Sequence, residues 1–228
     1  MRLLALDTAT EASSVALLSG HSILARRVET ARGASQDLLA LIEGLLGEAG
    51  CTLSMLDGIA ASVGPGAFTG VRIGVSVAQG LAYGADLPVV AVSTLEALAQ
   101  QAVSAGAERV LCCLDARMNE VYWECFAADP AVGIRPQGGP AVGPAGTVSV
   151  PFVAPFHGIG RGFQAHPSLA AALGAALAPG AAAALPDARD MATLGALRLA
   201  AGLGVEPGRL EPLYLRDKVA LTERERGR

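Results

Sequence analysis

The residues of this chain that are best placed for chemistry form a glycine-rich loop, residues 64–70 (GPGAFTG). The loop follows an apolar run and precedes a helical pattern, and in that setting backbone N–H groups and the helix dipole bind anions. A P-loop also needs a lysine directly after its last glycine, to reach the β and γ phosphates. Val71 stands at that place, and the one lysine of the chain is Lys218. A P-loop NTPase is therefore excluded, and two interpretations remain open, an anion site or a tight strand-to-helix turn.

Two aspartates end apolar runs and head short polar turns, residues 7–10 (DTAT) and 115–118 (DARM). In actin-like ATPases the first such turn carries glycine two residues after the aspartate, which lets the backbone approach the phosphates. Ala9 and Arg117 stand at that position here, and their side chains would crowd a nucleotide. We therefore do not expect ATP hydrolysis by this chain alone, and Asp7 is expected to end its strand and cap the turn.

The sequence contains no recognisable set of a nucleophile and a general base. The nearest approach to a G-x-S-x-G elbow, residues 74–78 (GVSVA), fails at its last position and lies within a predicted helix, so Ser76 is expected to be a small packing residue. His157 has no assignable partner. Glu120 and Glu124 alternate with apolar residues on a predicted strand, where Glu124 is expected to face solvent. No catalytic residue is predicted.

Metal and redox chemistry are not indicated either. The four cysteines, Cys51, Cys112, Cys113 and Cys125, include no C-x-x-C pair, and the three histidines are scattered. Zinc sites need closely spaced ligand pairs. The adjacent Cys112 and Cys113 would point to opposite faces of a strand, and the cysteines are expected to be reduced core residues. No metal-binding or cofactor-binding residue is predicted.

Composition limits the class of protein further. Of the 228 residues, 52% are hydrophobic and 17% charged, which excludes a disordered chain. Residues 1–104 hold five arginines and nine acidic residues, and residues 105–228 hold twelve basic and twelve acidic residues. Neither half has the basic surplus of a protein that grips nucleic acid by itself. The uncharged stretch 169–185 is rich in alanine and broken by Pro179-Gly180, so we predict no membrane span and a cytoplasmic protein.

Apolar runs and turn residues predict the elements that must position the two polar turns. Three strands come first, and Gly20-His21 makes a hairpin between the second and the third. Ser35 is expected to cap a helix that begins at Gln36, and Ser93 and Glu96 form a capping box before another helix. The predicted order is strands 2–7, 13–19 and 22–29, helix 36–48, strand 58–63, helix 71–83, strand 88–92 and helix 94–104. This order predicts an α/β fold with a mixed sheet flanked by helices.

The second half of the chain repeats the beginning of the first. Strands are predicted at 111–115 and 120–127, so that Asp115 follows an apolar strand as Asp7 does. Loops or short edge strands are expected over 130–151, and helices near 166–178 and 189–203. The sequence thus predicts two lobes, 1–104 and 105–228, with the tail 205–228 either packed back or frayed. The first lobe is similar to the ribonuclease-H-like domain shared by actin, the Hsp70 ATPase and sugar kinases, a likeness that implies no activity.

Several segments together resemble the TsaB (YeaZ) family, the actin-like accessory subunits of bacterial tRNA threonylcarbamoyladenosine synthesis. The resemblance rests on residues 4–10 (LALDTAT), 64–74 (GPGAFTGVRIG), 80–82, 92–95, 115–122 (DARMNEVY) and 211–216 (EPLYLR). The family usually has Gly where Asn119 stands and Ser where Ala67 stands. The second of these departures removes a hydroxyl from the glycine loop, so the loop is given no catalytic role. The motif positions taken to be structural are Asp7, Gly64, Gly66, Phe68, Thr69, Gly70, Asp115, Arg117 and Glu120.

The resemblance implies a two-lobed actin-like (ASKHA, ribonuclease-H-like) fold and a non-catalytic scaffold subunit. It implies pairing with TsaD, which transfers a threonylcarbamoyl group from its adenylate to N6 of adenosine 37 in tRNA, and with the ATPase TsaE. A TsaC-type adenylate-forming enzyme is implied as an indirect partner, and tRNA is contacted through the complex. The chain is implied to have no cofactor of its own, with ATP or ADP bound in the complex.

The implied partner surface lies on the helix 36–48 and on the helix after Gly70, which can also mediate a homodimer. Leucines on both sides of the first helix give an apolar stripe wider than one buried face needs, which makes Leu39 and Leu46 candidates for a partner seam. Burial of both by the sheet and a neighbouring helix is the alternative. The predicted interface residues are Leu38, Leu39, Ile42, Leu46, Arg72, Val75 and Gln79.

Two other classes of function remain as alternatives. A stand-alone actin-like ATPase would need nucleotide contacts that Ala9 and Arg117 oppose. A peptidase or chaperone-like factor that acts on TsaD is opposed by the absence of a nucleophile elbow and of a metal-ligand pattern.

Overall fold

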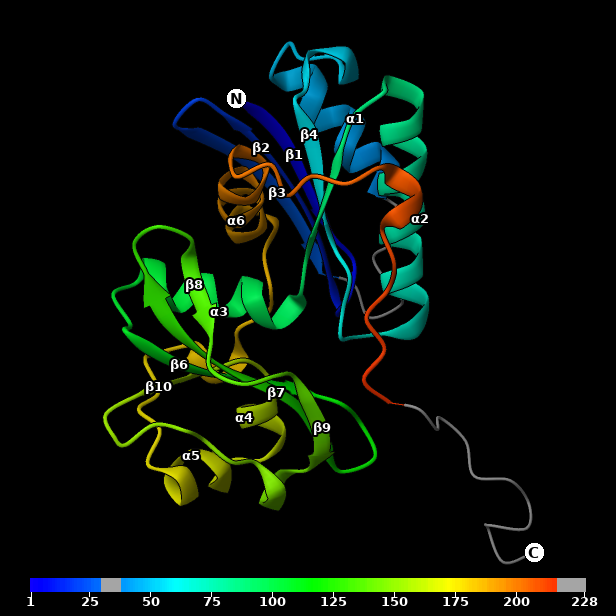
Figure 1. Cartoon of the computed structure of the whole chain (residues 1–228). Helices are drawn as coiled ribbons and strands as arrows, with labels where there is room; N and C mark the ends of the chain where they lie inside the picture. The colour runs from blue at the N-terminus through cyan, green and yellow to red at the C-terminus, as the bar shows by residue number, and fades with distance from the viewer. Residues whose placement is uncertain (30–37, 217–228) are drawn as a thin grey trace, which may run out of the picture.

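The computed structural model describes residues 1–29 and 38–216, which form two mixed β-sheets with helices on their faces (Figure 1). The strands of the first sheet, in spatial order, are β3 (Ser22–Glu29), β2 (Ala12–Ser19), β1 (Arg2–Asp7), β4 (Gly58–Ser62) and β5 (Val89–Val92). Those of the second sheet are β10 (His157–Ile159), β6 (Arg109–Asp115), β7 (Glu120–Asp129) and β8 (Gly133–Pro136), with β9 (Ala141–Pro144) also paired to β7.

The helices stack with the sheets in layers. One pair covers the outer face of the first sheet, a second pair lies between the sheets, and a third covers the outer face of the second sheet (Figure 1). In that order the pairs are α1 (Leu38–Glu48) with α2 (Phe68–Ala85), α3 (Thr94–Ser104) with α6 (Ala188–Ala200), and α4 (Gly162–Ala165) with α5 (Ser168–Leu173). Short 3-10 turns are η2 (Leu53–Met55), η3 (Ala145–Thr147), η4 (Ala181–Ala183) and η5 (Pro207–Arg209).

Local signals in the sequence predicted several of these elements closely. The hairpin between β2 and β3 pairs Ser19 with Ser22 around the predicted turn. The Ser93 hydroxyl accepts a hydrogen bond from the Glu96 amide at 3.0 Å, and the Glu96 carboxylate accepts one from the Ser93 amide at 2.8 Å, which confirms the capping box of α3. The predicted start at Gln36 and its cap Ser35 lie outside the described residues.

Central strands are buried on both faces because each sheet is covered by helices on both sides. In β1, Leu4 and Leu6 face α1 and α2, whereas Leu3 and Ala5 face α6. This explains why β1 reads as a continuous apolar run rather than as an alternating one. β6 follows the same rule.

The cysteines illustrate it on β6. Cys112 points into the core between the sheets and Cys113 into the core under α4 and α5, which confirms the prediction of opposite faces. Burial raises the pKa of both thiols above the usual range. Cys125 is also buried, and Cys51 is only partly so.

Glu124 corrects an expectation. The sequence predicts that it faces solvent, but its exposed fraction is 6%. It lies on β7 opposite Cys112, on the face that points to the space between the sheets. Alternation along a strand predicts an exposed face only if that face lacks a covering layer, and here α3 supplies one. Burial, and then the nearby Glu96 carboxylate, raises the pKa of Glu124 to about 7.

Helix boundaries differ from expectation at two places. α2 begins at Phe68, inside the glycine loop, and not near residue 71. The helix expected over 166–178 is shorter than predicted: α5 covers Ser168–Leu173 and ends where Gly174 takes a left-handed conformation with φ of 70°, and α4 lies before the expected range. None of the described helices is long and apolar enough to cross a membrane.

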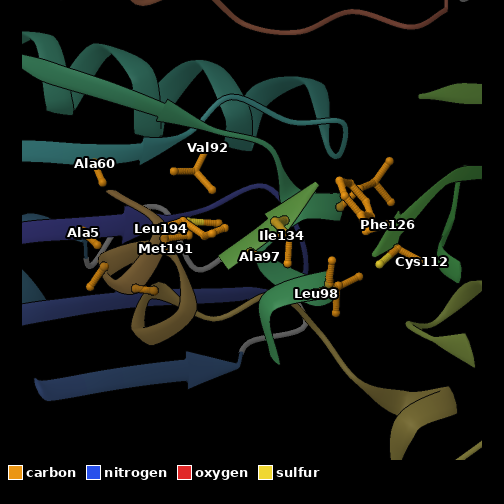
Figure 2. Packing of buried hydrophobic residues seen from close by; sticks show 14 of the residues in the cluster. Ala5, Ala60, Val92, Ala97, Leu98, Cys112, Phe126, Ile134, Met191 and Leu194 are labelled. Carbon is orange, nitrogen blue, oxygen red and sulfur yellow. The ribbon is translucent and has the colours of Figure 1, made fainter. Parts of the chain in front are cut away.

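The core between the sheets is one cluster that draws on both of them (Figure 2). Helices α3 and α6 fill the space: α6 packs on the first sheet, α3 packs on the second, and the two helices pack on each other. The labelled members are Ala5, Ala60 and Val92 from the first sheet, Cys112, Phe126 and Ile134 from the second, and Ala97, Leu98, Met191 and Leu194 from the two helices.

Small side chains set the distance between α6 and the first sheet. A Cβ atom on Gly195 would lie 2.6 Å from the Cβ of Ala60 and 2.9 Å from a methyl of Leu3. The Ala188 amide at the start of the helix donates to the Ser14 hydroxyl at 2.9 Å. The helix therefore lies against β1, β2 and β4 with no room for a larger residue.

Replacing Gly195 with alanine tests this close approach. We expect Gly195→Ala to lower the free energy of unfolding by about 1–3 kcal/mol, because the new methyl group overpacks the interface with Ala60. The matched control is Gly80→Ala on α2, where nothing lies within 4 Å of a new Cβ. It should raise the free energy of unfolding by up to about 1 kcal/mol through helix propensity. Urea denaturation followed by circular dichroism measures both, and equal effects would contradict the proposed packing.

Candidate functional site

The glycine loop, residues 64–70, packs directly against the first polar turn, residues 7–10. The Ala67 amide donates to the Ala9 carbonyl oxygen at 2.7 Å. A Cβ atom on Gly66 would lie 2.1 Å from that same oxygen. Glycine is therefore required here because two backbone segments approach each other, not to make room for a ligand.

A second contact of the same kind joins the start of α2 to the turn. The Thr8 hydroxyl donates to the Gly70 carbonyl oxygen at 2.7 Å, and a Cβ on Gly70 would lie 2.1 Å from the Thr8 carbonyl oxygen. On the other side of the loop, the Thr94 amide donates to the Gly64 carbonyl oxygen at 3.0 Å. A nucleotide phosphate does not fit between the turn and the loop, because their own backbones fill that space. The geometry favours the strand-to-helix turn over the anion site.

Asp7 caps the first polar turn as predicted. It is completely buried at the end of β1, and its Oδ1 accepts a hydrogen bond from the Ala9 amide at 3.0 Å. Its Oδ2 has no hydrogen-bond partner among the described residues. Burial raises the pKa of Asp7 to about 6, and the hydrogen bond from Ala9 opposes this shift.

The second polar turn, between β6 and β7, is held in a left-handed conformation. Arg117, Met118 and Asn119 have φ angles of 60°, 54° and 64°. Asp115 stabilises the turn, since its Oδ1 accepts from the Arg117 amide at 2.8 Å and its Oδ2 from the Arg117 guanidinium at 2.9 Å. Asparagine is among the residues that tolerate this conformation best, which accounts for Asn119 at the position where glycine is usual in the family.

Arginines of the second lobe reach across to the first polar turn. The Arg117 guanidinium donates to Glu11 at 2.9 Å, and Arg161 lies 3.6 Å from the other oxygen of Glu11 and 3.4 Å from Glu29. These side chains are partly exposed, so each pair contributes about 0–1 kcal/mol to stability. Arg117 is thus paired with two carboxylates rather than directed at a ligand.

A cleft of about 800 Å³ lies between the two polar turns. The first lobe lines it with the turn, the glycine loop and the start of α2, and the second with the β6–β7 turn and α4. The end of the described chain forms a further part of its wall. The lining residues with charged or aromatic side chains include Glu11, Phe68, Arg117, Arg161, Tyr214 and Arg216.

An aromatic and arginine stack lies at the edge of this cleft. The guanidinium carbon of Arg72 lies 3.5 Å from the centroid of the Phe68 ring, and Arg72 Nε donates to the Tyr214 hydroxyl at 2.6 Å. The two rings are 6.0 Å apart. Phe68 is 52% exposed and stacks at the surface. Sequence reasoning gave no role to Tyr214 or Arg216, although both lie in the family-like segment 211–216.

The predicted interface residues divide into buried and exposed groups. Most of them pack in the core under α1 and α2, and Gln79 Nε2 donates to the carbonyl oxygens of Pro207 and Leu210 within the chain. Leu39 is 59% exposed, and Arg72 is also exposed. The ones in the core are Leu38, Ile42, Leu46 and Val75. Burial by the sheet and its neighbours therefore accounts for most of the wide apolar stripe, including Leu46.

Ser76 corrects another expectation, since it is exposed on α2 and not packed. It lies in a shallow groove of about 390 Å³ along the outer side of the helix, lined by Phe68, Thr69, Arg72, Ile73, Ser76 and Val77.

Within residues 1–29 and 38–216, no three His, Cys, Asp or Glu side chains are grouped so that they could hold a metal ion.

The fold and the cleft define a two-lobed actin-like protein. The structure of component A of (R)-2-hydroxyglutaryl-CoA dehydratase from Acidaminococcus fermentans shares this fold, with a TM-score of 0.50 and 11% identity over 86% of this chain and 96% of that one. Two structures of YeaZ-type proteins from Pseudomonas aeruginosa, one of them described by similarity to the peptidase YeaZ, are much more similar. Their TM-scores are 0.86 and 0.84, at 43% identity over 94% of this chain and 99% of theirs.

Sequence comparison identifies the family. The chain is 40% identical to the tRNA threonylcarbamoyladenosine biosynthesis protein TsaB of Escherichia coli over 96% of both chains. It is 49% identical to TsaB of Haemophilus influenzae over 54% of this chain and 52% of the relative. The model of the family described as "TsaD: tRNA N6-adenosine threonylcarbamoyltransferase" matches residues 28–127. The chain belongs to the TsaB (YeaZ) family.

Replacing Asp7 with asparagine tests the shifted pKa. Because its pKa in the folded protein is raised above the usual 3.8 to about 6, the folded protein retains a proton that the unfolded chain releases between about pH 4 and pH 6. The free energy of unfolding of the parent should therefore fall as the pH rises through this window. In Asp7→Asn that fall should be smaller by up to about 3 kcal/mol.

Urea denaturation at pH values from 4 to 7.5 measures the difference between the two profiles. Asp86→Asn, at the exposed end of α2, is the control for loss of a surface carboxylate. Parallel profiles for the parent and Asp7→Asn would contradict a raised pKa.

Proposed function

We propose that this chain is the non-catalytic scaffold subunit of the enzyme that forms threonylcarbamoyladenosine at position 37 of tRNA. The observation that carries this proposal is the backbone contact of the first polar turn with Gly66 and Gly70, which uses the turn and the glycine loop for packing within the chain. The 40% identity to the E. coli TsaB protein, named for threonylcarbamoyladenosine biosynthesis, supports the choice of pathway.

The second polar turn supports the same conclusion about chemistry. Arg117 stands where a nucleotide site of this fold would need a residue without a side chain, and its guanidinium is paired with Asp115 and Glu11. Both turns are thus used for structure. The catalytic transfer is assigned to a TsaD partner, and any ATP or ADP to the assembled complex with TsaE rather than to this chain alone.

The proposed surface for TsaD is the outer side of α2 together with Leu39 of α1. The groove beside Arg72 and Ser76 is shallow, and Gly80 and Gly84 continue it with nothing within 4 Å of a Cβ placed on either. Small residues along an exposed helix allow the backbone of a partner helix to come close, and partly exposed apolar side chains supply contact area. The same surface would serve a homodimer in the absence of TsaD.

Other members of the pathway are proposed as more distant partners. A TsaC-type enzyme supplies the adenylate, and tRNA is held through the complex rather than by this chain, whose net charge of −4 gives it no surplus of basic groups. The proposed location is the cytoplasm, where tRNA is modified.

Reconstitution tests the proposal. The chain is mixed with TsaD, TsaE and the adenylate-forming enzyme of the same organism, with tRNA, threonine, bicarbonate and ATP, and the modified nucleoside is measured by mass spectrometry. We expect product only when the chain is present. The double variant Leu39→Asp/Ser76→Arg should weaken binding to TsaD at least tenfold, or about 1.4 kcal/mol, and reduce product in parallel.

Leu203→Asp is the matched control, because Leu203 is 61% exposed but follows α6, on the other side of the first sheet. Binding and product should match the parent in this variant. Equal product without the chain would overturn the scaffold role.

Nucleotide titration of the isolated chain separates the scaffold from a stand-alone ATPase. We expect no saturable binding up to about 1 mM ATP by calorimetry, and no release of phosphate. Tight binding with turnover would support the ATPase instead. Fragments of TsaD after incubation with the chain would support a peptidase.

A further inference from the structure

The last described residues of the chain connect the two lobes. Residues 205–216, here called the C-terminal strap, follow α6 and run past β5 and along α2 toward the second lobe (Figure 1, orange to red). Its final residues, 213–216, line the cleft. The strap thus contacts both lobes beside the site where they face each other.

The beginning of the strap is fixed to the first sheet and to α2. Val205 and Val89 exchange two backbone hydrogen bonds of 2.9 Å, which extends the first sheet at its β5 edge. Leu210 is 2% exposed and belongs to the core under α1 and α2. Gln79 holds the strap between these points, donating to the carbonyl oxygens of Pro207 at 3.2 Å and Leu210 at 3.0 Å.

The middle of the strap passes the glycine loop and the aromatic stack. The Leu213 amide donates to the Val63 carbonyl oxygen at 2.7 Å, directly after β4. Tyr214 then accepts a hydrogen bond from Arg72 and lies against Phe68. All of these contacts are with the first lobe.

The end of the strap reaches the second lobe through the side chain of Arg216. Arg216 donates to the Ala116 carbonyl oxygen at 3.2 Å and forms an ion pair with Glu120, with the Arg216 side chain 17% exposed and that of Glu120 30% exposed. Its guanidinium also lies 6.0 Å from the centroid of the Tyr122 ring. A charge-assisted pair with this degree of burial is stronger than the exposed pairs of Arg117.

We propose that the C-terminal strap is a latch that fixes the closure of the two lobes. The latch is closed when Arg216 of the strap forms its ion pair with Glu120 of the second lobe. In two-lobed proteins a ligand bound between the lobes commonly sets their closure. Here the C-terminal strap takes that place. Because the anchors on the first lobe are a buried leucine and backbone hydrogen bonds, the pair at Arg216 is the weakest contact of the strap, and release of the strap begins there.

Lobe closure is tested by the distance between two spin labels, one in each lobe. Glu43→Cys on α1 and Ser149→Cys in the second lobe, both exposed positions, carry the labels in a Cys51→Ser background, while the other three cysteines are buried. We expect one narrow distance distribution in the parent. Arg216→Gln and Glu120→Gln should each broaden it toward longer distances, and the double variant should be no broader than either single one, because both remove the same pair.

Hydrogen exchange gives a second readout at the amides of Leu213 and Glu120. In Arg216→Gln both should exchange about tenfold faster than in the parent, since release of the latch exposes them. The matched control is Arg209→Gln, an exposed arginine of the same strap outside its contact with the second lobe, which should change neither exchange nor distance.

The charge-swapped variant Arg216→Glu/Glu120→Arg decides the case if Arg216→Gln destabilises the whole chain. Return of the narrow distance distribution in the swapped pair supports the latch, and failure to restore it overturns the proposal. A distribution in Arg216→Gln that matches both the parent and Arg209→Gln would also overturn it. Neither result depends on TsaD, so the latch and the proposed function are tested separately.

Discussion

The fold depends on a buried layer that the two sheets share. Helices α3 and α6 lie between the sheets and pack on each other. The inner face of the first sheet packs on α6, and that of the second sheet packs mainly on α3. The close approach of α6 to the first sheet depends on small residues, since α6 has Gly195 where it meets Ala60. A chain with 4% aromatic residues can still build a dense interior in this way, because alanine and glycine let backbones replace large side chains as the packing surface.

That shared layer joins the lobes at one side and leaves the other side to weaker contacts. The two polar turns face each other across the cleft, where ion pairs of Glu11 with Arg117 and Arg161 connect them. Exposed pairs contribute about 0–1 kcal/mol each, whereas burial of one leucine such as Leu210 contributes about 1.5–3 kcal/mol. By this comparison the C-terminal strap is held more firmly on the first lobe, through Leu210, than on the second lobe, through Arg216.

The glycine loop has a structural role in this arrangement. Its backbone meets the first polar turn at Gly66 and Gly70, and the Ala67 amide donates to the Ala9 carbonyl oxygen. The turn and the loop together form a junction of strand, turn and helix. That junction sets the start of α2, and the outer side of α2 exposes Arg72 and Ser76 in the shallow groove.

The sequence by itself determined the elements whose signals are local. The β2–β3 hairpin, the capping box of Ser93 and Glu96, the opposite faces of Cys112 and Cys113 and the role of Asp7 in its turn all depend on residues a few positions apart. The family-like segments extended this to the two-lobed fold. For the candidate site, they located both polar turns and the glycine loop that surround the cleft.

Only the tertiary structure decided which faces are covered. Glu124 and Leu46 are buried and Ser76 is exposed because of what packs on the second side of a strand or helix, and no local pattern reports that. The strap is the clearest case, since Arg216 meets Glu120 from 96 residues away. Periodicity shows which face of a helix or strand is apolar. Which faces are buried, and which distant residues pair, depends on the arrangement of the whole chain.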